Sequence, residues 1–217
     1  VRGLKTVNVN LDVREEDLAN VPADGPMVVV SNHPFGGLDA LVIANVLHQA
    51  GREIKFIANF LLRLIPEAQD EIFPVDPFGG PGATTRSMSG LKSAIRHVKS
   101  GGVLGVFPAG EVAHSRLRNL AAVDPRWNSI VGRLAQRTGA PVLPIFIEGR
   151  NSAWFQVLGM LHPRLRTMLL AREMLKKQNS TVRVHVGKLI PNEKLTNFTA
   201  PDELTGYLRV RTHLLAE

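Results

Sequence analysis

A histidine and an aspartate share the short segment SNHPFGGLDA, and together they could activate a hydroxyl group. His33 follows a run of apolar, β-branched residues, and Asp39 falls in the first turn of a stretch with helical spacing. The glycine pair between them permits a sharp turn that brings the carboxylate to one imidazole nitrogen. The other nitrogen can then take a proton from a hydroxyl. The alternative is a histidine that only caps the helix, beside an aspartate that interacts with the helix dipole.

A second candidate segment, VFPAGEVAH, ends another apolar run. Backbone N–H groups in a Pro-Ala-Gly turn can hold an anionic oxygen, and a glutamate beside them can bind a hydroxyl or an amine. We therefore expect this turn to bind substrate through Phe107, Pro108, Ala109, Gly110 and Glu111. The alternative is an ordinary exit from a strand with solvated polar side chains.

The segment PVLPIFIEGRNSAWF supplies a third candidate, Arg150. This arginine lies just beyond a predicted strand, where it could bind a phosphate or a carboxylate, although a surface arginine is more often solvated. The strand itself carries Pro144 near its middle. A proline is unusual in a central strand, and this one could shape the wall of a pocket.

These candidates need strands that end close together, and the apolar runs predict such strands. The predicted strands are residues 4–13, 27–31, 54–58, 103–107, 142–148 and 181–187, and the predicted helices are 38–50, 84–102, 130–137, 152–177 and 203–215. Strands that alternate with helices predict an α/β fold, with a central mixed, largely parallel sheet flanked by helices. Sites in such sheets gather at the carboxyl ends of strands, where the first two candidate segments lie.

Composition narrows the choice of partners. The 217 residues suit a single domain, residues 1–217, with a core over about 27–190. The absence of cysteine excludes a thiol nucleophile, and a net charge of +7 favours polyanions such as nucleic acid or anionic lipid. Aromatic residues are only 6% and no nucleic-acid-binding signature occurs, so nucleic acid is not an expected partner. No apolar run reaches the roughly 18 residues of a membrane span.

Taken together, the three segments resemble the lysophospholipid acyltransferase superfamily. Its blocks read N-H-x-x-x-x-D, F-P-E-G-T-R and a V-P-I or V-P-V strand, and here they read NHPFGGLD, FPAGEV and VLPI. The exact residues of these segments are more similar to a hemolysin-like branch of the superfamily, which includes acyltransferases of ornithine and glycine lipids. The resemblance implies a glycerol-phosphate-acyltransferase-like fold, with His33 as general base and Asp39 as the residue that orients it.

The resemblance also implies the partners of the reaction. The donor would be acyl-CoA or an acyl carrier protein (acyl-ACP), which is a co-substrate, and no metal or other cofactor would take part. The acceptor would be a lysolipid, and the protein would attach as a peripheral protein to an anionic membrane surface, on the cytoplasmic face.

This sequence departs from the family pattern where other members bind a phosphate. Five residues separate His33 from Asp39 instead of four, and the glycine pair is expected to absorb the extra one. The usual glutamate is replaced by Ala109, the usual arginine by Val112 and the usual lysine by Asn59. Without the arginine and the lysine, a phosphate monoester is poorly held. We therefore expect an amino-acid lysolipid as acceptor rather than lysophosphatidic acid. Four arginines could replace the missing cations: Arg86, Arg116, Arg118 and Arg150.

Two further segments could meet lipid. Residues 152–177 combine apolar side chains with arginines and lysines, which predicts a face against an anionic membrane. The alternative is that the apolar side chains pack in the core and the cations face solvent. The apolar side chains of NFLLRLIP, residues 59–66, are expected to line an acyl groove.

Three other functions compete with acyl transfer. The chain could be a non-catalytic, hemolysin-like membrane-binding protein, or an acyl-thioester hydrolase that uses the same base on water. A nucleic-acid-binding domain is suggested by charge alone. We favour acyl transfer, because neither non-catalytic reading explains why His33 and Asp39 flank a turn at the end of a buried strand.

Overall fold

The computed structural model describes residues 8–76, 82–110, 114–116, 119–123, 126–152, 173 and 175–216. Its centre is a 7-stranded sheet in the order β1–β9–β8–β2–β5–β3–β4. The strands are β1 (Asn10–Val13), β2 (Met27–Ser31), β3 (Lys55–Asn59), β4 (Ile72–Val75), β5 (Val103–Val106), β8 (Val142–Ile147) and β9 (Thr181–Val186). An antiparallel pair, β6 (His114–Arg116) and β7 (Asn119–Val123), forms a separate 2-stranded sheet.

Most neighbouring strands of the large sheet run in the same direction. The strands β8, β2, β5, β3 and β4 pair in parallel, whereas β9 is antiparallel to β8 and β1 is parallel to β9. The prediction of an α/β fold with a central mixed, largely parallel sheet is therefore confirmed. Because parallel strands end at one edge, the segments that follow β2, β5, β3 and β8 all leave the sheet there.

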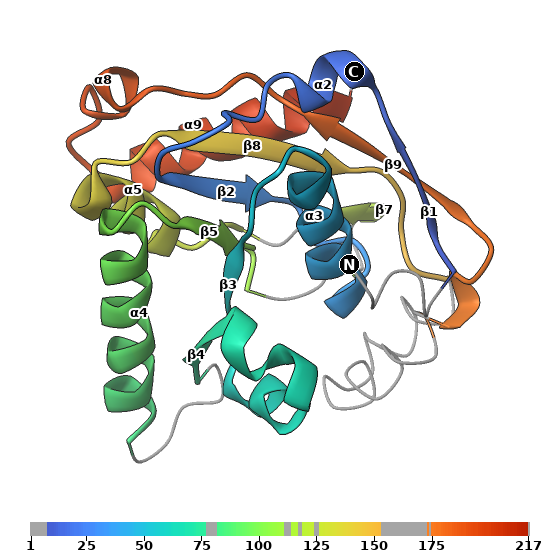
Figure 1. Ribbon diagram of the computed structural model, residues 1–217, viewed down its shortest axis with the longest axis horizontal. Coiled ribbons are helices and arrows are strands. Elements are labelled where there is room, and N and C mark those ends of the chain that lie inside the picture. The colour runs from blue at the N-terminus through green and yellow to red at the C-terminus, as the bar shows by residue number, and fades with distance from the viewer. Residues whose placement is uncertain are drawn as a thin grey trace.

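Helices cover both faces of the sheet (Figure 1). The helix α3 (Gly37–Gln49) packs on one face, and α4 (Ala83–Lys99), α5 (Ile130–Thr138) and α9 (Pro201–His213) contribute to the core on the other. Alternate side chains of β2 enter the two cores: Val29 packs with α3, and Val28 and Val30 with the opposite set. Burial on both faces explains why this strand carries Met27 and three successive valines.

Several short elements complete the fold. They are α2 (Glu15–Leu18), α8 (Asn192–Leu195), η1 (Phe60–Leu64), η2 (Pro66–Glu71), η3 (Leu214–Ala216) and the strand β4. Of these, α2, α8 and β4 were not predicted. β4 contains Pro74, which argues against a central strand, but β4 lies at the edge of the sheet where a missing N–H is tolerated. Pro144 in β8 is buried, and its ring lies where a Cβ on Gly187 would clash, so the glycine makes room for it.

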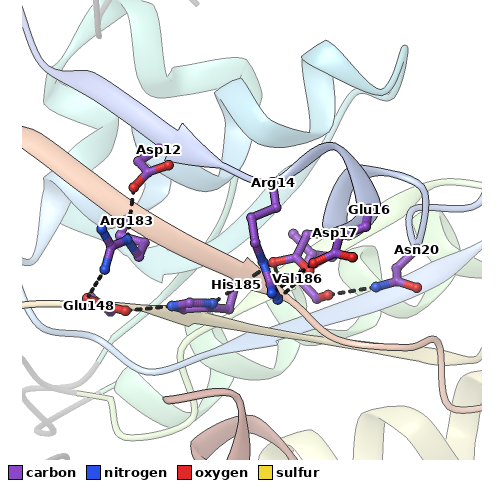
Figure 2. Close-up of polar contacts among 9 residues, drawn as sticks. All are labelled: Asp12, Arg14, Glu16, Asp17, Asn20, Glu148, Arg183, His185 and Val186. Carbon is purple, nitrogen blue, oxygen red and sulfur yellow. Dashed lines mark hydrogen bonds and ion pairs between the residues drawn. The ribbon is translucent and has the colours of Figure 1, made fainter. Parts of the chain in front are cut away.

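A polar network joins β1 and α2 to the neighbouring strand β9 and to the residue that follows β8 (Figure 2). Arg183 of β9 donates to Asp12 of β1 at 2.8 Å, and its guanidinium lies 3.8 Å from Glu148. His185 of β9 hydrogen-bonds Glu148 across 2.6 Å, while Asp17 of α2 accepts from the backbone N–H of Val186 at 3.2 Å. These contacts tie β1 and α2 to β9 and β8.

Two sequence predictions fall mainly outside the described residues. They are the start of the first strand, before residue 8, and most of the helical, membrane-facing segment 152–177. In the part of the chain that the structure describes, no helix is both long enough and apolar enough to cross a membrane.

Candidate active site

The side chains of His33 and Asp39 meet at the carboxyl end of β2. The Nδ1 atom of His33 lies 2.8 Å from Oδ2 of Asp39. Asp39 is fully buried, and the His33 side chain is 17% exposed. An ionised carboxylate can only accept hydrogen bonds, so Nδ1 carries the proton and Nε2 of the neutral ring is the basic nitrogen. This is the arrangement in which an imidazole can remove a proton from a hydroxyl.

A tight turn brings the two residues together. The backbone N–H groups of Phe35 and Gly36 each donate to Oδ2 of Asp39 at 2.9 Å. Gly36 precedes α3 with a φ of 87° and a ψ of −130°, a conformation that side chains with a Cβ rarely adopt. Gly37 is the first residue of α3. The turn therefore accommodates the five residues between His33 and Asp39 through the conformation of Gly36.

Burial dominates the electrostatics of Asp39. Desolvation raises the pKa of its carboxyl group, and the hydrogen bonds from His33, Phe35 and Gly36 partly offset this effect. Oδ1 has no hydrogen-bond partner among the described residues, although it is buried. A carboxylate that is this poorly solvated interacts strongly with a positive charge on the neighbouring imidazole. The site is thus suited to stabilise His33 once it has taken up a proton.

Aromatic rings support the other side of the histidine. The ring of Phe107, directly after β5, stacks on His33 with centroids 4.2 Å apart and planes 18° apart. Phe56 of β3 stacks in turn near Phe107, at 5.9 Å and 5°. The end of β5 thus contributes a surface that limits rotation of the imidazole.

The side chain of Asn32 joins the turn that carries His33 to β8. Its Nδ2 donates to the carbonyl oxygen of Ile147 at 2.8 Å, and its Oδ1 accepts from the N–H of Ile147 at 2.8 Å. Asn32 is 6% exposed and Ile147 is fully buried. Because Asn32 precedes His33, this pair of bonds holds the start of the turn against the neighbouring strand. The Asn-His dipeptide is visible in the sequence, but the bonds from Asn32 to Ile147 were not predicted.

The second candidate segment lies beside the first, as far as it is described. Pro108 is buried and its carbonyl oxygen accepts from Asn128 at 2.9 Å, while Ala109 is half-buried. Gly110 is exposed and closes a turn, with its N–H donating to the carbonyl oxygen of Phe107 at 3.0 Å. Glu111 lies outside the described residues. Of this predicted substrate-binding set, Phe107 is the residue that contacts His33.

The third candidate, Arg150, is exposed on the segment after β8. Its backbone carbonyl binds Lys177, a residue that was not predicted to belong to the site. The ammonium group of Lys177 donates to the carbonyl oxygen of Arg150 at 3.2 Å and lies 4.5 Å from the centroid of the Phe35 ring. Burial lowers the pKa of Lys177, and the carboxylates of Glu173 and Asp39 partly offset this. No carboxylate of a described residue forms an ion pair with it within 4.0 Å. Sequence patterns did not indicate the position of Lys177, because it lies far along the chain from Phe35.

The family described as Acyltransferase matches residues 12–148, more than half of the chain. The chain belongs to the Acyltransferase family. The matched region of this acyltransferase contains the His33 and Asp39 turn and the turn after β5, whereas Arg150 lies just beyond it. The resemblance read from the sequence is confirmed at the level of the family.

Two bacterial relatives resemble this acyltransferase over most of its length. A lyso-glycine lipid O-acyltransferase of Phocaeicola vulgatus is 27% identical over 209 residues, which cover 92% of this chain and 72% of the relative. A lyso-glycine lipid O-acyltransferase of Bacteroides thetaiotaomicron is 27% identical over 207 residues, with 91% and 72% covered.

A solved structure supports the fold. The 1-acyl-sn-glycerophosphate acyltransferase PlsC of Thermotoga maritima superposes with a TM-score of 0.56 at 17% identity, covering 99% of this chain and 74% of that one. The predicted glycerol-phosphate-acyltransferase-like fold is therefore confirmed.

The other cations proposed for substrate binding differ in what surrounds them. Arg86 of α4 donates from Nε to Asp76 at 3.1 Å and lies 5.9 Å from the centroid of the Phe60 ring. Arg118 lies outside the described residues, as does the side chain of Arg116. Arg150 lies on the segment following β8 and Lys177 contacts it, as does Lys176, which donates to Ser152 at 3.3 Å and to Glu173 at 2.8 Å.

Proposed function

We propose that this acyltransferase is a lysolipid O-acyltransferase, in which His33 is the general base and Asp39 orients it. It would transfer a fatty acyl group from a thioester, acyl-CoA or acyl-ACP, to the hydroxyl of an amino-acid lysolipid. The observation that carries the proposal is the 2.8 Å contact between Nδ1 of His33 and the buried carboxylate of Asp39. This contact assigns the basic nitrogen of the ring to Nε2.

The proposed reaction needs only one proton carrier. Nε2 of His33 removes the proton of the acceptor hydroxyl while the hydroxyl oxygen attacks the thioester carbonyl carbon. The tetrahedral intermediate collapses, the C–S bond breaks, and the imidazolium returns the proton to the leaving thiolate. The products are an ester and a free thiol, and Asp39 stabilises the imidazolium between the two steps.

Backbone groups near Phe107 are suited to the negative charge of the intermediate. Gly110 closes an exposed turn with a φ of 71°, directly after the half-buried Ala109. Turns of this kind present N–H groups that can bind an oxyanion. The turn after β5 is therefore the proposed place for the thioester carbonyl.

The nature of the headgroup is proposed from the relatives and the cations. Both bacterial relatives carry the name lyso-glycine lipid O-acyltransferase. Ala109 and Val112 stand where other members place a glutamate and a phosphate-binding arginine. An amino-acid headgroup offers a single carboxylate, for which Lys177 and Arg150 are suitable partners. A substrate of this kind lies in a bilayer, so the protein would act as a peripheral protein, and we place it on the cytoplasmic face.

The acceptor can be identified by incubating the protein with a radiolabelled acyl donor and a panel of lysolipids. The panel contains lyso-glycine lipid, lyso-ornithine lipid and lysophosphatidic acid, each offered with acyl-CoA and with acyl-ACP. We expect labelled diacyl product with an amino-acid lysolipid. Labelled free fatty acid without product would instead indicate thioester hydrolysis, and acylation of lysophosphatidic acid alone would refute the proposed acceptor.

A pair of histidine variants tests the base. His33→Ala should lower the transfer rate by about 100-fold to 10,000-fold. His48→Ala, at an exposed histidine near the end of α3, should leave the rate unchanged. A folded His33→Ala protein with full activity would refute the assignment. If vesicle disruption persisted in a variant lacking His33 and Asp39 and no transfer were detected in wild type, a non-catalytic membrane-binding function would replace it.

A further inference from the structure

Exposed apolar side chains gather in one short segment. Of the large hydrophobic side chains that the described structure exposes, Leu61, Leu62, Leu64 and Ile65 fall within residues 60–65, with exposed fractions of 44%, 37%, 79% and 48%. The remaining four are spread over separate elements. Contiguous apolar exposure of this kind is unfavourable in water and marks an interaction surface. We call residues 60–65 the docking segment.

The local geometry explains why so many of these side chains face outward. Residues Phe60–Leu64 form the 3₁₀ helix η1, whose first turn is capped by Asn59 accepting from the N–H of Leu61 at 3.0 Å. With three residues per turn, Leu61 and Leu64 lie in the same row of η1, and Leu62 lies in the next row. Ile65 ends the helix with an extended backbone. The exposed apolar side chains therefore project from one short helix and the residue that ends it.

The docking segment lies at the active edge of the sheet. It follows β3, which is parallel to β5 and, through β5, to β2, so η1 leaves the same edge as the turns that carry Phe107 and His33. Phe56 of β3 also stacks near Phe107, whose ring stacks on His33. An apolar surface beside the catalytic turn is well placed for a substrate that resides in a bilayer.

The charges around the segment indicate how it would bind. Arg63 lies in η1 three residues after Phe60 and could meet a lipid phosphate, but Glu67, Asp70 and Glu71 follow in the exposed η2. The carboxylates outnumber the cation, so apolar insertion rather than attraction to anionic lipid must supply the binding. A bilayer provides an apolar layer together with headgroups that solvate both signs of charge.

We propose that the docking segment inserts Leu61, Leu62, Leu64 and Ile65 into the surface of a lipid bilayer and so holds the active edge against the membrane. The proposal rests on the proposed function in one respect, that the acceptor is a lipid. It replaces the expectation that this segment lines an acyl groove.

The test compares two charged substitutions at exposed apolar positions. Leu64→Asp lies in the docking segment, and Val210→Asp lies on α9, where Val210 is 57% exposed. Binding is measured by co-sedimentation with phosphatidylcholine vesicles, with and without phosphatidylglycerol. We expect Leu64→Asp to bind at least about tenfold more weakly to both kinds of vesicle and Val210→Asp to bind like wild type. Equal binding by Leu64→Asp and wild type would overturn the proposal.

A second measurement separates docking from catalysis. Acyl transfer is assayed with a long-chain lysolipid in vesicles and with a short-chain lysolipid dissolved as a monomer. Leu64→Asp should lose activity on the vesicles and keep it on the monomer. If the wild type transfers no acyl group at all, the proposed function fails while the vesicle result still stands. If Leu64→Asp only dissociates a dimer on size exclusion and binds vesicles normally, a second copy occupies the segment and docking is refuted.

Discussion

The rings of His33 and Phe107 stack 4.2 Å apart, although one follows β2 and the other follows β5. The contact joins the two turns proposed for catalysis and for substrate binding. Phe107 covers one face of the imidazole and Asp39 binds Nδ1 at its edge, so that both a ring and a carboxylate determine its orientation. The transfer reaction should therefore depend on residues of both turns.

Replacing the stacking ring should slow transfer without abolishing it. Phe107→Leu keeps an apolar side chain but removes the stacking, and such aromatic pairs contribute about 0.5–1.5 kcal/mol. We expect kcat to fall about twofold to tenfold, with the base still present. Phe73→Leu, where the ring tilts against His97 in another part of the core, is the matched control. An unchanged kcat in Phe107→Leu would show that the stack does not position His33.

The Asp39→Asn substitution should separate activity from stability. Burial raises the pKa of Asp39, so ionisation is less favourable in the folded protein than in the unfolded chain. As pH rises above about 4, the ordinary pKa of an aspartate, the wild type loses folding free energy through this ionisation and the variant does not. The Tm difference, variant minus wild type, should therefore increase with pH, while transfer falls at least about 100-fold. A constant or decreasing difference would contradict the burial argument.

Two adjacent glycines should respond differently to alanine. Gly36 has a φ of 87°, and Gly36→Ala should lower the free energy of unfolding by about 1–3 kcal/mol and displace Asp39. Gly37 begins α3, and a Cβ there meets no atom within 4 Å. Gly37→Ala should be neutral or stabilising by up to about 1 kcal/mol. Urea denaturation of both variants checks this, and equal effects would contradict it.

Removing the Asn32 side chain should weaken both the fold and the site. Asn32→Ala leaves the N–H and the carbonyl of the buried Ile147 without these partners, a loss of about 1–3 kcal/mol in the free energy of unfolding. Because His33 is the next residue, kcat should fall as well. Asn45→Ala, which removes only a surface hydrogen bond with Gln49, serves as the control for chemical denaturation and for kinetics. If Asn32→Ala were as stable as Asn45→Ala, the bonds between Asn32 and Ile147 would not hold the turn against β8.

Lys177 should affect recognition of the acceptor rather than the chemical step. Lys177→Met keeps an unbranched apolar side chain and removes the charge that lies over the Phe35 ring. If the headgroup carboxylate binds there, KM for the amino-acid lysolipid should rise about tenfold with little change in kcat. The exposed Lys188→Met provides a control of equal charge change. Equal KM values for both variants would remove Lys177 from the acceptor site.

Local patterns of residue types were enough to predict most of the regular elements and the contact between His33 and Asp39. The strand β2 was predicted with the observed bounds, because a strand buried on both faces shows as a short, mostly apolar and β-branched run. His33, Gly36 and Asp39 lie within one turn, so their meeting depended on short-range geometry that the residue types reveal. The strand β4 was missed because Pro74 is compatible only with an edge, and strand order is not a local property.

The contacts that complete the site depend on the tertiary structure. Asn32 and Ile147 are 115 residues apart, and Lys177 reaches Phe35 from far along the chain. Such pairs form only when the order and direction of the strands bring their ends to one edge. By itself, the sequence determined which groups could do the chemistry and the elements that carry them. Only the folded sheet decided which ring stacks on His33 and which side chains face outward, because those contacts arise from packing between distant segments.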